Sequence, residues 1–212
     1  MPQSGSGRVL AVGDIHGQRE KLARLMEKVK PTPEDELVFL GDYIDRGPDA
    51  KGVIEYLIAL QKRLPRAHFI RGNHEQMLLD YLEEGDELGF YLYNGGGATL
   101  SSYERDGRPD IPLHHLEFLR NLPFYHQTDE FIFVHAGLRP PLPLEEQDPQ
   151  DLLWIRQEFL RSSYSWGKTV VFGHTPVSEP SFAPERIALD TGAGHGGPLS
   201  CCELRTGHCW SL

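Results

Sequence analysis

Short apolar runs that end in glycine and polar residues recur along the 212-residue chain. Each run is three to five residues long and rich in β-branched, aromatic and leucine side chains, which is typical of buried strands. Glycine after a run lets the backbone leave the sheet, so the polar residues that follow are delivered at the strand's carboxyl end. We predict strands over residues 8–12, 37–40, 68–70, 131–134, 169–172 and 187–189, and a final strand around Cys201 and Cys202.

Helical spacing of apolar residues separates these strands. Between residues 18 and 29, apolar side chains from Leu22 to Val29 recur three or four positions apart, which predicts a helix with one apolar face. Three glycines at 95–97 predict a mobile turn. Strands that alternate with helices are typical of an α/β domain with parallel neighbouring strands. Further helices are predicted over residues 52–60, 77–82, 116–122 and 152–160, the last anchored in the core by Trp154 and Phe159.

Length, composition and charge limit the class of protein further. A chain of 212 residues with 25% charged and 39% apolar residues predicts one globular domain over residues 1–212, with a flexible lead-in at residues 1–7. Residues 76–127 are the least regular part, and we expect them to form a substrate-facing region of helices and loops. The formal charge of −10 argues against nucleic acid or an anionic membrane as the main partner.

Cysteines and apolar runs bear on the location of the protein. No apolar run approaches the length of a membrane span, and the N-terminus lacks the pattern of a signal peptide. Three cysteines, at positions 201, 202 and 209, are too few for a disulfide framework, and the adjacent pair is interpreted as packing within a strand. We expect a cytoplasmic protein with no membrane attachment, and a monomer.

Metal-binding residue types follow the predicted strands. They are Asp14, His16, Asp42, Asn73, His135 and His174. Oxygen and imidazole ligands without thiolate suit Mn²⁺, Fe or Zn²⁺. Six such ligands are too many for one ion with an open position, but they suit two divalent ions about 3.5–4 Å apart. A shared carboxylate is the natural bridge between the ions, and the central segment GDYIDRG at residues 41–47 provides Asp42.

Five segments in a fixed order give the chain a family resemblance. GDIHG, GDYIDRG, RGNHE, VHAG and FGHT all occur within residues 8–204. With this set the chain resembles the phosphoprotein phosphatase family of metallophosphoesterases, and among its members the bacterial serine/threonine protein phosphatases and the phage lambda phosphatase. The resemblance implies a calcineurin-like α/β sandwich, in which two mixed β-sheets pack face to face, helices flank them, and a dinuclear metal site lies at the strand ends.

The resemblance also implies a role for each matching residue. One ion would be held by Asp14 and His16, the second by Asn73, His135 and His174, and both by Asp42. A hydroxide between the ions would attack phosphorus in line, without a phosphoenzyme. His74 would act as the general acid, oriented by Asp45. The phosphate oxygens would be bound by Arg46, Arg71, Arg156 and His74. The histidines outside the motifs, including His68, His114, His115 and His126, are interpreted as ordinary structural residues, and His195 is a candidate substrate contact.

Three functions are compatible with these residues. A serine/threonine protein phosphatase acting on phosphorylated proteins or peptides is favoured, because serine and threonine leave poorly and Asp45 would orient the acid they need. Symmetrical diadenosine tetraphosphate hydrolases share the GDIHG, GNH and VHAG elements and are the alternative. A non-catalytic phosphate-binding module would require a lost ligand or acid, and none is missing. Activity on phosphotyrosine is left open.

Overall fold

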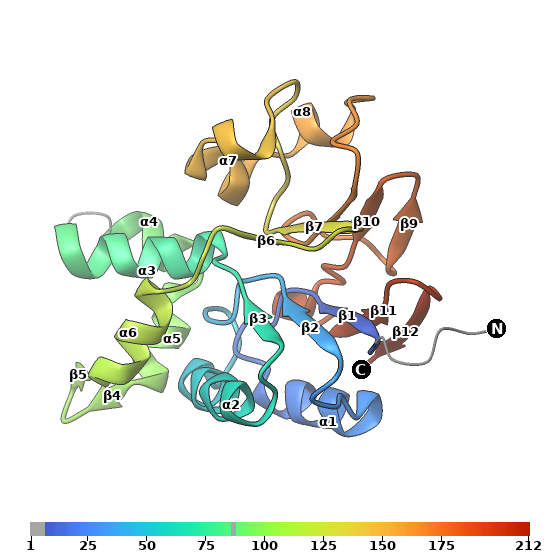
Figure 1. Ribbon diagram of the computed structural model, residues 1–212. Coiled ribbons are helices and arrows are strands. Elements are labelled where there is room, and N and C mark those ends of the chain that lie inside the picture. The colour runs from blue at the N-terminus through green and yellow to red at the C-terminus, as the bar shows by residue number, and fades with distance from the viewer. Residues whose placement is uncertain (1–6, 86–87) are drawn as a thin grey trace.

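Two mixed sheets dominate the computed structural model, which describes residues 7–85 and 88–212 (Figure 1). The first sheet has the order β12 (His208–Ser211), β11 (Ser200–Glu203), β1 (Val9–Val12), β2 (Glu36–Phe39) and β3 (Ala67–Phe69). The second has the order β6 (Tyr125–Gln127), β7 (Phe131–Val134), β8 (Thr169–Phe172), β10 (Arg186–Ala188) and β9 (Ser181–Ala183). In the first sheet β2 pairs in parallel with β1 and β3, and in the second β8 pairs in parallel with β7 and β10, while the remaining pairs are antiparallel.

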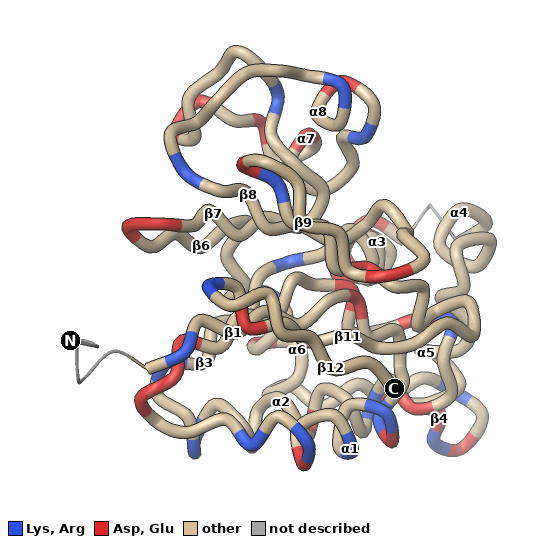
Figure 2. Tube along the Cα trace, turned by 90° about the vertical axis from the view of Figure 1, so that its right-hand side faces the viewer, with Lys and Arg blue, Asp and Glu red and all other residues tan. Residues whose placement is uncertain are grey.

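Helices cover the outer faces of both sheets. Figure 2 separates the layers: α7 and α8 lie above the second sheet, and α1 and α2 lie below the first. A further group of helices and the short β4–β5 hairpin (Glu104–Arg105, Arg108–Pro109) lies to one side of the sheets in Figure 1. The helices are α1 (Arg19–Val29), α2 (Ala50–Arg63), α3 (Asn73–Glu84), α4 (Leu88–Tyr93), α5 (Gly96–Ser102), α6 (Leu113–Arg120), α7 (Pro149–Trp154) and α8 (Gln157–Leu160), with 3₁₀ turns η1 (Leu144–Glu146) and η2 (Ala193–His195).

Successive side chains of a strand point to opposite faces of the sheet and therefore pack in different apolar clusters. In β1, Leu10 and Val12 pack in the cluster that contains the apolar faces of α1 and α2, while Val9 and Ala11 pack between the sheets. A third cluster joins the second sheet to α7 and α8. Because the inner strands are buried on both faces, they have continuous apolar sequences, which is why short apolar runs predicted them. The predicted sandwich of two mixed sheets is confirmed.

Several local predictions differ from the structure. The helix expected over residues 152–160 is two helices, because Ile155 has an extended backbone (φ −59°, ψ 143°) and places Arg156 at the cap of α8 rather than inside a helix. The turn expected at 95–97 is confined to Gly95, since α5 begins at Gly96. The remaining predicted strands and helices are present, with ends shifted by a few residues. Helices α4 and α5 and strands β4, β5, β6, β9 and β12 were not predicted.

The cysteine prediction is wrong in one respect. Cys202 and Cys209 form a disulfide, because the antiparallel register of β11 and β12 places them directly opposite each other. Cys201 faces the other side of the sheet and is buried as a free thiol, as the packing interpretation expected. Since disulfides persist mainly in oxidising compartments, the cysteines do not support the expected cytoplasmic location. Within residues 7–85 and 88–212, no helix is long and apolar enough to cross a membrane.

Candidate active site

The carboxyl ends of the parallel strands bring the predicted metal ligands together. Parallel strands present these ends at one edge of a sheet, and the two stacked sheets present theirs side by side. Asp14 follows β1, Asp42 follows β2, Asn73 opens α3 after β3, and the two histidines His135 and His174 follow β7 and β8. All are at most 6% exposed.

The backbone at these strand ends is unusually strained. Non-glycine residues rarely adopt a left-handed backbone, and such residues cluster at functional sites. Here His16, Asp42 and His174 have φ of 48°, 51° and 60°. Gly41 (φ 96°) makes the sharp turn before Asp42, and a Cβ on it would lie 2.6 Å from the Gly72 nitrogen. The loops after β2 and β3 therefore pack backbone to backbone, and this contact fixes the position of Asp42.

Asp42 is shared by two groups of candidate ligands. Its Oδ2 lies 3.5 Å from Nε2 of His16, and its Oδ1 lies 3.4 Å from Nε2 of His135. One group combines Asp42 with His16 and His74, and the other combines it with His135 and His174. The two carboxylate oxygens thus face different groups, which is the arrangement required of a ligand that bridges two ions.

Hydrogen bonds orient the imidazole rings toward this carboxylate. His16 donates Nδ1–H to the Ile44 carbonyl at 2.9 Å, and His135 donates Nδ1–H to the Leu40 carbonyl at 2.8 Å. In both rings Nε2 then points toward the ligand cluster, on the side where a metal would bind. The Oδ1 atom of Asn73 lies 2.8 Å from Nε2 of His135 and 3.0 Å from Nδ1 of His174, so these three donor atoms converge.

The charges of the buried groups suit a cationic occupant. Burial lowers the pKa of His16 to about 3 and, together with the charge on His135, lowers that of His174 to about 3, so both rings are neutral ligands at pH 7. Burial and the charge of Asp190 raise the pKa of Asp14 well above its usual range. A bound cation stabilises a carboxylate in such a position. The donors therefore fit two divalent ions in number, type and orientation.

His74 and Asp45 form a second buried unit beside the ligands. His74 donates Nδ1–H to Asp45 Oδ2 at 2.6 Å, and the residues are 1% and 0% exposed. The other carboxylate oxygen of Asp45 accepts hydrogen bonds from the hydroxyls of Tyr91 (2.8 Å) and Thr99 (2.5 Å). Nε2 of His74 lies 3.9 Å from Asp42 Oδ2. The ring is therefore held with one nitrogen toward the ligand cluster, where it can carry a proton.

The structure brings two of the three predicted arginines to the ligand cluster. Arg46 Nη1 lies 2.9 Å from His16 Nε2, and Arg156 Nε lies 3.1 Å from His174 Nε2. These guanidinium groups approach different histidines and are placed to bind one anion between them. Arg71 instead donates to the side chain of Gln76 and to the carbonyl of Arg120, each at 2.7 Å. In this conformation these hydrogen bonds of Arg71 are made to residues other than the predicted metal ligands.

Four residues of the site were not predicted as members of it. Glu75 accepts hydrogen bonds from the backbone nitrogens of Gly72, Asp42 and Tyr43, and so fastens the start of α3 to the loop after β2. Its position inside the RGNHE segment was a usable signal. Asp190 follows the predicted strand 187–189, as the other acids follow theirs. Tyr91 and Thr99 come from the irregular middle region, and no local pattern marks them.

Two groups of donors that share one carboxylate, with arginines beside them, define a metal-dependent phosphoesterase. Residues 7–202 match the calcineurin-like phosphoesterase family, and the chain belongs to this family. Its members use divalent metals, which agrees with the donor set described above. Relatives of the phosphoprotein phosphatase type also match over nearly the whole chain, so the family resemblance of the sequence is confirmed.

The relatives differ in their named substrates. A serine/threonine-protein phosphatase 1 from Salmonella typhimurium is 31% identical over 207 residues, covering 93% of this chain and 92% of that protein. A bis(5'-nucleosyl)-tetraphosphatase PrpE of the asymmetrical type, from Bacillus thuringiensis, is 28% identical, covering 89% of this chain and 87% of that protein.

Solved structures similar to this chain also differ in the substrates that their descriptions name. A crystal structure provisionally described as a diadenosine tetraphosphatase has a TM-score of 0.77 and 27% identity, and covers 100% of this chain and 95% of that one. A cold-active protein-tyrosine phosphatase from Shewanella has a TM-score of 0.65 and covers 98% of this chain and 81% of that one, and with 19% identity it shows the fold alone.

Proposed function

We propose that this protein is a serine/threonine protein phosphatase that hydrolyses phosphomonoesters directly, by in-line attack and without a phosphoenzyme. The observation that carries the proposal is the buried His74–Asp45 pair, in which both carboxylate oxygens of Asp45 accept hydrogen bonds. Such a unit is costly to build, since both side chains are removed from water. It is useful where a leaving group needs a proton.

Proton transfer to the leaving oxygen is the task that suits His74. Because Nδ1–H is bonded to Asp45, the proton that the imidazole can give up lies at Nε2, on the side of Asp42. An alkoxide of serine or threonine is strongly basic, so a positioned donor lowers the barrier of its departure. Tyr91 and Thr99 keep Asp45 in place, because each donates to the oxygen that His74 does not use.

Phosphate binding falls to the guanidinium groups near the ligands. Arg46 and Arg156 contact His16 and His174, and their forked donors match the oxygens of a phosphoryl group. Arg71 could join them only after it gives up its bond to Gln76. When bound, two divalent ions supply an activated water and offset the phosphate charge. Local cations of this kind reconcile a dianionic substrate with a protein of formal charge −10.

Manganese is the ion we propose. Three of the six donors predicted to hold the ions are imidazoles, one is an amide and two are carboxylates. Such a set favours Mn²⁺, Fe or Zn²⁺ over Mg²⁺, which prefers oxygen and retains its water.

Dinucleoside tetraphosphate hydrolysis is the second candidate. The observation that favours it is the 28% identity to tetraphosphatases over 89% of the chain. Cleavage of a phosphoanhydride releases a phosphate anion, which leaves readily and gains little from an acid. The elaborate support of His74 therefore favours the phosphomonoester substrate.

A side-by-side assay decides between them. The protein with Mn²⁺ is given a phosphoserine peptide, a phosphotyrosine peptide and diadenosine tetraphosphate, and kcat/KM is measured for each. We expect the phosphoserine peptide to be the best substrate. A higher kcat/KM for diadenosine tetraphosphate than for either peptide would overturn the proposal in favour of the second candidate.

A further inference from the structure

A second group of metal-binding residue types lies away from the active site, where the edges of the two sheets meet. Glu36 begins β2, at the opposite end of that strand from Asp42. His68 lies in β3, the edge strand of the first sheet, and His126 lies in β6, the edge strand of the second. The sequence alone gave no reason to connect residues so far apart in the chain.

The donor atoms of this group converge on one carboxylate oxygen. Nε2 of His126 lies 2.8 Å from Oε1 of Glu36, and Nε2 of His68 lies 3.0 Å from the same atom. In a tetrahedral zinc site with bonds of about 2.0–2.1 Å, ligand atoms lie about 3.3 Å apart. The observed separations are about 0.3 and 0.5 Å shorter than that value, so an outward movement of this size would admit an ion.

Neighbouring side chains hold the three donor residues close together. Arg66 donates to the other oxygen of Glu36, with its Nε at 3.0 Å and Nη2 at 2.6 Å, and leaves Oε1 to the histidines. Such outer contacts fix ligand geometry in metal sites. The rings of His68 and His126 stack, with centroids 3.9 Å apart and 14° between their planes, and Phe133 packs against His126. Because nearly parallel rings cannot both aim a lone pair at one ion, one ring turns out of the stack when the ion binds. The charge on Arg66 weakens the attraction for a cation but does not occupy the donor atoms.

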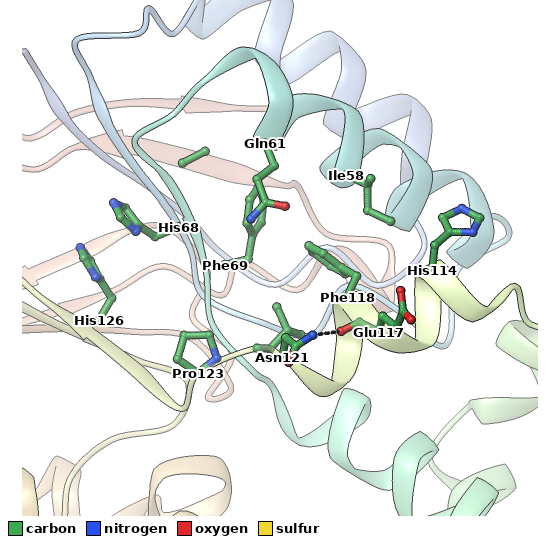
Figure 3. A pocket seen from close by; sticks show the side chains of 12 residues that line it. Ile58, Gln61, His68, Phe69, His114, Glu117, Phe118, Asn121, Pro123 and His126 are labelled. Carbon is green, nitrogen blue, oxygen red and sulfur yellow. Dashed lines mark hydrogen bonds between the residues drawn. The ribbon is translucent and has the colours of Figure 1, made fainter.

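A cavity gives this group access to solvent. Figure 3 shows His68 and His126 side by side at one end of a cavity of about 480 Å³, with Phe69, Phe118 and Glu117 farther along and His114 at the other end. The two side chains are 33% and 22% exposed. An ion can therefore enter, and a water molecule can complete its coordination.

We propose that Glu36, His68 and His126 form a binding site for Zn²⁺ or a similar divalent transition ion, separate from the active site, which clips the two sheets together at their edges. Two imidazoles and one carboxylate with an open fourth position are a donor set that zinc accepts. On binding, His126 replaces its hydrogen bond to Glu36 by a bond to the ion, His68 likewise binds the ion through Nε2, and each ring carries its proton at Nδ1. Each ring stays neutral, so no proton need be released.

Metal counting tests this site in the full-length protein. Wild-type protein and the variants His68→Gln, His126→Gln and His114→Gln are equilibrated with Zn²⁺, freed of unbound metal and analysed by mass spectrometry. His114→Gln is the matched control, because it removes a histidine from the same cavity but not from the group. We expect His68→Gln and His126→Gln to bind one zinc fewer than the other two proteins. Equal zinc content in all four would overturn the proposal.

Two further measurements test the zinc site without counting ions. Zinc at 100 times its dissociation constant should raise the melting temperature of wild type by about 5–10 °C more than that of His126→Gln. Anomalous scattering from zinc-saturated wild-type crystals should give a peak about 2.0–2.3 Å from the three donor atoms. Absence of that peak would overturn the proposal even if a variant failed to fold.

Discussion

Replacement of His74 by asparagine separates proton donation from metal binding. The His74 ring is 1% exposed, and its Nδ1–H bond to Asp45 leaves Nε2 as the position of a transferable proton. Asparagine remains polar beside Asp45 but carries no proton that it can give up. The predicted ligands Asp42 and Asn73 keep their own hydrogen bonds, so we expect both metal ions to stay bound.

The size of the rate loss should depend on the leaving group. A general acid contributes about 10²–10⁴ in rate, which corresponds to roughly 2.7–5.4 kcal/mol in activation free energy. A phosphoserine peptide should lose this full factor, because a serine alkoxide departs poorly without a proton. With p-nitrophenyl phosphate the departing phenolate is stable, and the loss should be clearly smaller. Asp45→Asn should show the same order of losses at lower amplitude, since it disturbs the orientation of His74 without removing it.

The assay measures kcat/KM for both substrates together with the metal content and melting temperature of each protein. His115→Asn is a matched control for stability, since His115 is also fully buried and hydrogen-bonded, to Tyr103, but lies in α6. It should lower the melting temperature without changing the ratio of the two rates. Equal losses on both substrates for His74→Asn, or loss of metal from that variant, would refute the role of His74 as the acid.

Three further predictions concern the metals, the arginines and Glu75. Chelation should abolish activity, Mn²⁺ should restore it better than Mg²⁺, and the melting temperature should rise with Mn²⁺; full activity after exhaustive chelation would contradict this. Arg46→Ala should lower both affinity and rate, with partial rescue by Arg46→Lys, and unchanged phosphopeptide kinetics in Arg156→Ala would remove that residue from the site. Glu75→Gln should lower the free energy of unfolding by about 1–3 kcal/mol, because one amide oxygen cannot accept from all the backbone donors. In thermal unfolding, the melting temperature should fall by about 2–4 °C for each kcal/mol. An unchanged melting temperature would argue against the proposed role of Glu75 in fastening α3 to the loop after β2.

The positions of the predicted metal ligands follow from local sequence. A buried strand needs an apolar run, a turn out of the sheet needs glycine, and the polar residue after it lies at the carboxyl edge whatever the rest of the chain does. Asp14, Asp42 and His174 each follow this rule. Topology then brings the strand ends together, and topology follows from the alternation of strands and helices.

Contacts between distant segments could not be predicted in this way. Thr99 reaches Asp45 from 54 residues away and Tyr91 from 46, and neither has a local pattern that marks it. The disulfide between Cys202 and Cys209 depends on the register of β11 and β12, which a spacing of seven residues does not specify. Ile155 breaks a helix whose apolar spacing is otherwise continuous, so tertiary packing outweighs local preference there.

The tasks proposed for Asp42 and Asp45 differ because their partners differ. The two carboxylates lie three residues apart in one loop, are almost completely buried and share a left-handed backbone, with φ of 51° and 70°. Asp42 faces imidazole nitrogens at 3.4–3.5 Å, distances that leave room for an ion between donor atoms. Asp45 is contacted at 2.5–2.8 Å by hydroxyls and by a ring N–H, so both of its oxygens already accept short hydrogen bonds. The helices α4 and α5 supply the two hydroxyls, and they are therefore what makes the second aspartate a support for His74 rather than another metal ligand.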